Sequence, residues 1–301
     1  MSEHATTRLR LDIAYDGTDF LGWSKQPGLR TVQGELEANL AILLRRSGLK
    51  PVIHVAGRTD AGVHALAQVA HVDLNDEQLR SLDTRRGKGD PVAGANLLAK
   101  RLNGIAGLDT DVHVIRSSVA PEGFDARFSA TWRRYEYRIA DATAPRNPLL
   151  RNHTLWHPSV LDVDAMAAAA ASLTGLHDWA SYCKPREGAT TIRNLQEFTW
   201  RRLDDGLMVA HVRADAFCHS MVRALVGASV AVGEGKLRIE DVVDLRDAHE
   251  RTAAFKVMPA KGLALAEVGY PADSEMGARA ELTRQRRDPA ALRLTERPEA
   301  D

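Results

Sequence analysis

The sequence has only two cysteines, Cys183 and Cys218, and neither belongs to a C-x-x-C pair. A disulfide framework and a structural zinc site both need several cysteines at close spacing, so neither is expected. We expect two reduced thiols in a cytoplasmic protein. The fold must then depend on a hydrophobic core.

The sequence also lacks a long apolar segment and an excess of either charge. Its longest apolar stretch, around residues 225–232, is too short to span a bilayer. The N-terminus has neither the basic nor the apolar region of a secretory signal, so we expect no membrane association. Forty basic and 40 acidic residues give a net charge of +0, which argues against wholesale coating of nucleic acid but is compatible with a local basic cleft.

What is present is enough to build a large core. The 301 residues are 44% hydrophobic and 27% charged, which excludes wholesale disorder and suggests about two domains. A linker with Pro145 and Pro148 separates a predicted N-terminal subdomain, residues 7–140, from a C-terminal one, residues 150–270. The charged tail, residues 271–301, is expected to be loosely ordered.

The pattern of strands and helices predicts an α+β fold. Leu9, Leu11 and Ile13 alternate with polar residues in a half-buried strand, and residues 32–46 form an amphipathic helix after an N-cap at Thr31. Further strands are expected at residues 51–56, 68–74, 111–117, 131–139, 193–203, 206–214 and 263–268, and further helices at 163–173, 217–232 and 239–247. Strands joined by hairpins favour antiparallel sheets over a parallel βαβ arrangement. Residues 75–94 change in character, and the polar, turn-rich segment at 85–91, with its basic run at 85–88, predicts a mobile loop.

The strongest functional candidate is Asp60, within the segment GRTDAGVHA at residues 57–65. It follows a predicted buried strand in a turn flanked by Gly57 and Gly62, which is how a rigid scaffold presents a catalytic carboxylate. Arg58 supplies a cation that would keep this carboxylate ionised. The alternative is an ordinary turn with Arg58 in solvent. His64 is either an acid or base, or a structural hydrogen-bonding residue.

Two later segments combine basic and aromatic side chains. On the strand at residues 131–139, Tyr135 shares a face with Arg133, an arrangement that suits stacking of a base beside a phosphate or, alternatively, a core strand with a charged outer face. In the helix expected at residues 217–232, His219 and Arg223 lie on one stripe. Arg223 either extends to solvent or pairs with a buried carboxylate.

Taken together, these segments resemble the tRNA pseudouridine synthase A family. Five motifs occur in the family's order over about residues 8–270, namely YDGTDFLGW at 15–23, GRTDAGVHA at 57–65, FDARFSA at 124–130, RRYEY at 133–137 and FCHSMVR at 217–223. The resemblance implies two similar subdomains whose antiparallel sheets join across a central catalytic cleft, with helices packed on one side. It also implies a homodimer that needs neither cofactor nor metal.

By this resemblance the protein isomerises uridine to pseudouridine at positions 38 to 40 in the anticodon stem-loop of tRNA. Asp60 matches the catalytic nucleophile, Tyr135 the residue that stacks on the target uracil, and Arg223 the basic partner of the aspartate. Arg58 matches an arginine that opens or occupies the place of the flipped nucleotide.

Further substrate contacts are expected from Arg127, His219 and Leu265, of which Leu265 would help to retain the detached uracil. Ser24 stands where the family usually has a glutamine, so no role is carried over to it. The basic run at residues 85–88 looks like an insertion that contacts tRNA phosphates or is merely solvated. Two other functions remain as alternatives: a carboxylate-dependent nucleoside hydrolase, and an RNA-binding or chaperone protein without turnover.

Overall fold

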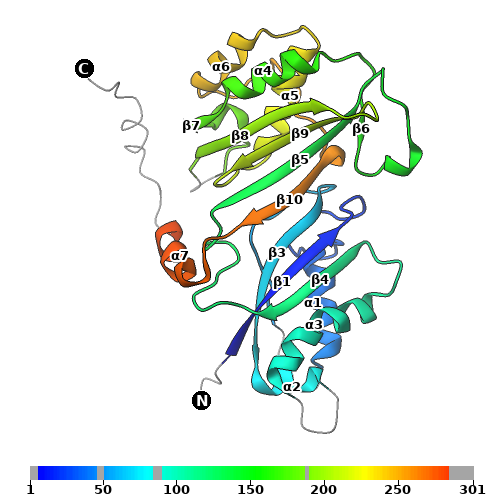
Figure 1. Ribbon diagram of the computed structural model, residues 1–301, viewed down its shortest axis with the longest axis vertical. Coiled ribbons are helices and arrows are strands. Elements are labelled where there is room, and N and C mark those ends of the chain that lie inside the picture. The colour runs from blue at the N-terminus through cyan, green and yellow to red at the C-terminus, as the bar shows by residue number, and fades with distance from the viewer. Residues whose placement is uncertain (1–5, 46–50, 84–89, 187–189, 285–301) are drawn as a thin grey trace, which may run out of the picture. The chain divides into compact units, whose positions relative to one another are not determined.

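The structure is a computed structural model that describes residues 6–45, 51–83, 90–186 and 190–284. It divides into two compact units (Figure 1). The described part of unit 1 comprises residues 6–131 and 265–284, and that of unit 2 comprises residues 132–264. The division therefore falls at residues 131–132, ahead of the proline linker that the sequence suggested, and the chain returns to unit 1 at Leu265.

Unit 1 is built on an antiparallel sheet with the strand order β4-β1-β3-β10, and β2 pairs with β3. As the sequence predicted, Leu9, Leu11 and Ile13 of β1 are completely buried. The elements of this unit are β1 (Thr6–Tyr15), α1 (Val32–Leu43), β2 (His54–Val55), β3 (His64–Asn75), α2 (Asp76–Leu82), α3 (Pro91–Ala106), β4 (Val112–Val119), β10 (Leu263–Gly269) and α7 (Met276–Arg284).

The mobile loop predicted at residues 85–91 lies outside the described residues except for Asp90 and Pro91, which cap and begin a helix. Asn75 and Gln78 form a reciprocal capping box that starts α2. The Asp90 carboxylate accepts hydrogen bonds from the backbone of α3, which begins at Pro91. The polar residues therefore cap two helices, and the basic run at 85–88 lies outside the described residues.

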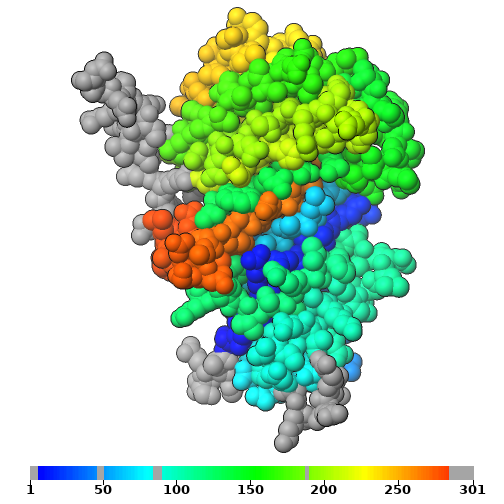
Figure 2. All heavy atoms as spheres, viewed as in Figure 1, coloured from blue at the N-terminus to red at the C-terminus, as the bar shows by residue number. Residues whose placement is uncertain are grey.

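The expected loose tail also begins with ordered structure. In helix α7, Met276 and Ala280 are buried, and the Met276 carbonyl accepts a hydrogen bond from Ser129 Oγ at 3.0 Å. In Figure 2 the orange spheres of β10 and α7 form a continuous surface. The sequence did not predict this helix, in which two apolar residues four positions apart bury one side. Residues 285–301 lie outside the described part.

Unit 2 contains antiparallel strands in the order β5-β9-β8-β7, and the short strand β6 runs parallel to β5. Helix α4 packs against β8, α5 and α6 (Figure 1). Helix α5 is apolar around its whole circumference and is buried almost throughout. The elements are β5 (Trp132–Ala140), β6 (Leu155–Trp156), α4 (Val163–Ser172), β7 (Gly175–Asp178), β8 (Ile192–Arg202), β9 (Met208–Ala214), α5 (Met221–Gly233) and α6 (Ile239–Asp247).

The α+β class and the antiparallel sheets predicted from the sequence are confirmed. The expectation of two reduced thiols is not confirmed, because the structure pairs Cys183 and Cys218 as a disulfide with their Cα atoms 5.8 Å apart. The sequence did not predict this proximity, because the two cysteines are 35 residues apart in the chain. The backbone brings the two segments together, since Lys184 N–H donates to the carbonyl of His219 at 2.9 Å.

Candidate active site

The turn that carries Asp60 joins β2 to β3 in unit 1. The buried strand predicted at residues 51–56 is found as only two residues, His54 and Val55, and neither of them is buried. The turn that follows is nevertheless fixed from its first residue onward. The Ala56 N–H donates to the Val69 carbonyl at 2.8 Å, and the Gln68 side-chain amide donates to the Gly57 carbonyl at 2.9 Å. The turn is therefore anchored on β3 just before its functional residues.

Within this turn, Arg58 is exposed, Thr59 is buried and Asp60 is partly buried. The Asp60 carbonyl accepts a hydrogen bond from the Val63 N–H at 3.2 Å, which closes the turn, and Gly62 adopts a φ of 76°. A left-handed conformation of this kind favours glycine. The carboxylate of Asp60 and the guanidinium of Arg58 thus stand two residues apart on a firmly closed turn, as the sequence suggested.

A second segment of unit 1, residues 16–23, lies directly against this turn. Two backbone hydrogen bonds join the segments, from Trp23 N–H to the Thr59 carbonyl and from Gly62 N–H to the Phe20 carbonyl, both at 3.1 Å. The approach is closest at Gly17, where an added Cβ would lie 2.0 Å from the Val63 carbonyl oxygen. Two motifs that are far apart in the sequence therefore form one substructure around Asp60.

His64 belongs to this substructure as a structural residue. It is buried, its Nδ1 accepts a hydrogen bond from the Gly17 N–H at 3.0 Å, and the same nitrogen lies 3.1 Å from an Asp16 carboxylate oxygen. Of the two roles open from the sequence, these contacts favour the structural one.

In unit 2, Tyr135 lies on β5 and is buried apart from 8% of its surface. Its ring meets the ring of Phe217 edge to face, with centroids 5.1 Å apart. Arg133 on the same face is buried and donates to the Asp215 carbonyl at 2.9 Å. The sequence motif that contains Phe217 predicted no role for it, because its contact with Tyr135 on β5 depends on the tertiary fold.

The helix that carries Arg223 starts later than expected. Helix α5 begins at Met221, and Ser220 before it has a left-handed backbone with a φ of 64°. The exposed His219 therefore precedes the helix, and the prediction that it shares a helical stripe with Arg223 is wrong. Arg223 Nε donates to the Met258 carbonyl at 2.6 Å, and the Met258 N–H donates back to the Arg223 carbonyl at 3.1 Å.

The remaining predicted residues lie in unit 1. Arg127 is exposed, and its guanidinium lies over the Phe128 ring at 5.2 Å from the centroid. Leu265 on β10 is completely buried. Their proposed contacts with substrate stay predictions. The structure thus groups Arg58 with Asp60 in one unit, and Tyr135, His219 and Arg223 in the other.

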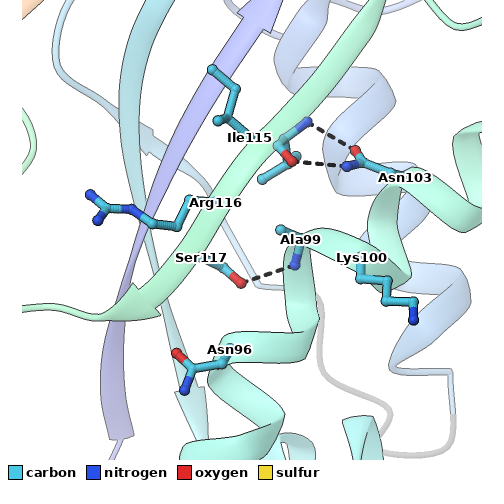
Figure 3. A pocket seen from close by; sticks show the side chains of 8 residues that line it. Asn96, Ala99, Lys100, Asn103, Ile115, Arg116 and Ser117 are labelled. Atoms are coloured by element: carbon cyan, nitrogen blue, oxygen red, sulfur yellow. Dashed lines mark hydrogen bonds between the residues drawn. The ribbon is translucent and has the colours of Figure 1, made fainter.

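A separate hollow of about 400 Å³ lies between α3 and β4 in unit 1 (Figure 3). Its walls are held together by Asn103, which makes two hydrogen bonds to the backbone of Val114, and by Ser117, which accepts from the Ala99 N–H. None of the residues predicted from the sequence lines it. Its lining consists of Asn96, Ala99, Lys100, Asn103, Val114, Ile115, Arg116 and Ser117.

No three His, Cys, Asp or Glu side chains within residues 6–45, 51–83, 90–186 and 190–284 gather so that they could hold a metal ion. Over the same ranges, no helix has the length and apolar character needed to cross a membrane.

Comparison with known proteins agrees with the motifs. The family model described as tRNA pseudouridine synthase matches residues 169–271. The tRNA pseudouridine synthase A of Leifsonia xyli is 62% identical over 94% of this chain and 98% of its own length. The proteins of the same name from Frankia casuarinae and Streptomyces avermitilis are 52% and 50% identical, each over 94% of this chain and over 96% and 95% of their own lengths. The chain belongs to the tRNA pseudouridine synthase A family.

Proposed function

We propose that this protein isomerises uridine to pseudouridine in tRNA, with Asp60 as the catalytic carboxylate. The observation that carries the proposal is the position of Asp60 on a closed turn that two family motifs build together. Near-complete coverage by relatives named as tRNA pseudouridine synthases supports the same reaction.

The reaction defines what the site must do. The bond between N1 of uracil and C1′ of the ribose breaks, the uracil turns, and C5 bonds to C1′. The proton on C5 is released and N1 takes up a proton, so that the product is an isomer of the substrate. A base within an RNA stem cannot be reached, so it must be flipped out at a cost of a few kcal/mol. The site must also retain the detached uracil and keep water out, because hydrolysis would otherwise compete.

Side chains of both units fit these tasks. Tyr135 offers an aromatic face to the flipped base, and stacking on an aromatic residue contributes roughly 1–3 kcal/mol per base, a large part of the cost of flipping. Arg223 supplies a positive charge to pair with the Asp60 carboxylate, and Arg58 fills the place that the flipped nucleotide leaves. Arg127, His219 and Leu265 are assigned to contacts with the substrate.

We further propose that the substrate region is the anticodon stem-loop, at positions 38 to 40, and that the protein acts in the cytoplasm as a homodimer. Mapping pseudouridine by carbodiimide modification of tRNA that lacks it in the anticodon arm tests the region. Modification confined to another arm would contradict it. Sedimentation of the purified protein tests the dimer.

Tritium release tests the reaction itself. The wild-type protein should release tritium from tRNA carrying C5-tritiated uridine, whereas Asp60→Ala should release none and still bind tRNA. Asp109→Ala is the matched control, because it removes an exposed carboxylate from a turn of the same unit. Release of free uracil would identify a hydrolase, and binding of tRNA without tritium release would identify an RNA-binding or chaperone protein.

A further inference from the structure

Three polar side chains meet in the interior of unit 1, on the inner side of the turn that carries Asp60. They are Tyr15 at the end of β1, Thr59 in the turn and Gln68 on β3, with exposed fractions of 5%, 7% and 0%. The Tyr15 hydroxyl lies 2.8 Å from Thr59 Oγ1, and the Gln68 amide nitrogen lies 3.3 Å from the same hydroxyl. We call these three residues the turn anchor.

The side chain of Gln68 donates two of the hydrogen bonds that hold the turn anchor together. The amide nitrogen of Gln68 is a donor, and it serves both the Gly57 carbonyl at 2.9 Å and the Tyr15 hydroxyl oxygen. The Tyr15 hydroxyl and Thr59 Oγ1 share a further hydrogen bond, in which either oxygen can be the donor. Burial raises the pKa of Tyr15 to about 12, against smaller opposing effects of its hydrogen bonds, so the hydroxyl is protonated and able to donate at neutral pH.

These contacts hold the chain immediately before Asp60 at two points. Gln68 fixes the carbonyl of Gly57, and Tyr15 fixes the side chain of Thr59, the residue next to the proposed nucleophile. On the other side, the closed turn and the hydrogen bond from Gly62 N–H to the Phe20 carbonyl fix the chain after Asp60. Displacement of either point would move the Asp60 carboxylate relative to a bound nucleotide.

We propose that Tyr15, Thr59 and Gln68 are positioning residues that hold the Asp60 carboxylate in its reactive place. This inference rests on the proposed function, in which Asp60 is catalytic. A buried polar cluster is not needed for stability alone, because apolar residues of similar volume commonly fill such a space as well. Here each member of the cluster is bonded to the turn or to a residue that is.

The test compares variants that differ by one hydroxyl or one methyl group. Thr59→Val keeps the shape of the side chain and removes the hydroxyl, Thr59→Ser keeps the hydroxyl, and Tyr15→Phe removes the other partner. For Thr59→Val and Tyr15→Phe we expect kcat for tritium release to fall about 10- to 100-fold, the effect of a misplacement of up to an ångström. KM and tRNA binding should stay within about twofold, and Thr59→Ser should restore most of kcat.

Tyr182→Phe is the matched control. Tyr182 is a buried tyrosine of unit 2 whose hydroxyl donates to the Val242 carbonyl at 2.8 Å, so this variant also loses a buried hydroxyl hydrogen bond. It should keep the wild-type kcat. If it loses kcat as Tyr15→Phe does, the effect is one of general stability and the inference is overturned.

The double variant Tyr15→Phe with Thr59→Val is a second test of the proposal. One shared interaction predicts that the double variant loses no more kcat than either single variant, whereas multiplied losses would contradict the turn anchor. Wild-type kcat in both single variants, together with an inactive Asp60→Ala, would overturn this inference and leave the proposed function intact. A wild-type protein that releases no tritium would instead overturn the proposed function.

Discussion

The turn that carries Asp60 and the helix start that carries Arg223 are held in different ways. In unit 1, backbone hydrogen bonds from residues 16–23 and a buried cluster of polar side chains hold the turn on both sides of Asp60. In unit 2, Arg223 stands on a buried apolar helix and makes hydrogen bonds to Met258 from both its backbone and its guanidinium.

Both regions nevertheless contain a glycine that allows two backbone segments to approach each other closely. Gly17 allows residues 16–23 to approach the end of the turn, and Gly227 allows the segment before Met258 to approach α5. A Cβ at Gly17 would lie 2.0 Å from the Val63 carbonyl oxygen, and one at Gly227 would lie 2.0 Å from that of Lys256. Each of the two candidate side chains, Asp60 and Arg223, therefore stands beside a close backbone contact.

The largest expected effect comes from Gly17→Ala and Gly227→Ala. Backbone cannot yield as a flexible side chain does, so each added methyl group should lower the free energy of unfolding by about 3 kcal/mol, the upper part of the usual range for overpacking. Both variants should also lose activity, because the segments beside Asp60 and Arg223 are pushed away. Urea unfolding and tritium release measure the two effects.

Gly104→Ala is the control for this comparison. Gly104 lies inside α3, and nothing stands within 4 Å of the place that its Cβ would occupy. Alanine there should raise the free energy of unfolding by about 0.5–1 kcal/mol, since glycine weakens a helix interior by that amount. If Gly17→Ala were as stable as wild type, the close contact would not hold the turn.

The two units also contain ion pairs that differ in burial, and breaking them should have a smaller effect on the free energy of unfolding. In unit 2, the Asp141 side chain is completely buried and accepts from Arg202 at 2.8 Å, from Thr143 Oγ1 at 2.7 Å and from Leu161 N–H at 3.1 Å. Burial acts to raise the pKa of Asp141, but the Arg202 guanidinium and these hydrogen bonds outweigh it and hold the pKa well below its usual range. The carboxylate is therefore charged throughout the neutral range.

Asp141→Asn should lower the free energy of unfolding by about 1.5–3 kcal/mol, the range for a buried hydrogen bond to a charged group. Its counterpart in unit 1 is Asp73→Asn, which breaks an ion pair with Arg8 in which both side chains are 36% exposed. That change should cost at most about 1 kcal/mol because solvent screens the pair. Equal losses in urea unfolding would show that burial does not decide the difference.

The elements that the sequence predicted well are those with a regular apolar pattern. Leu9, Leu11 and Ile13 mark β1 by alternation alone, and the helix expected at residues 239–247 is found with those bounds as α6. Apolar periodicity reports directly on which side of an element is buried. Where apolar residues fill the whole element, as in α5, the pattern has no phase, and the start of the helix was placed four residues too early at Phe217.

The parts of the candidate site show the same limit. A single motif placed Arg58 and Asp60 on a turn, since the signal is local. The turn anchor could not be predicted from the sequence, because Tyr15 and Gln68 meet only through the register of β1 against β3. That register shifts between Ile13 and Tyr15. A one-residue error in that register would place either side chain on the opposite face of the sheet.

The last expected effect depends on pH and concerns a buried histidine of unit 1. His71 on β3 stacks on the His54 ring, with centroids 5.0 Å apart, and its Nδ1 accepts from the Ala126 N–H at 3.1 Å. Burial, assisted by the Arg8 charge, lowers the pKa of His71 to about 4. The unfolded chain then binds a proton between about pH 6.5 and pH 4 that the folded chain refuses, so this contribution to stability is complete above pH 6.5 and is lost as the pH falls.

The loss cannot exceed about 1.4 kcal/mol per pH unit for a single proton. His71→Asn keeps an acceptor for the Ala126 N–H and removes the titration, so the difference in unfolding free energy between pH 7 and pH 5 should shrink in this variant. His113→Asn, which removes an exposed histidine from β4, should leave that difference unchanged. An equal pH dependence in wild type and His71→Asn would mean that acid weakens unit 1 through its carboxylates rather than through its buried imidazole.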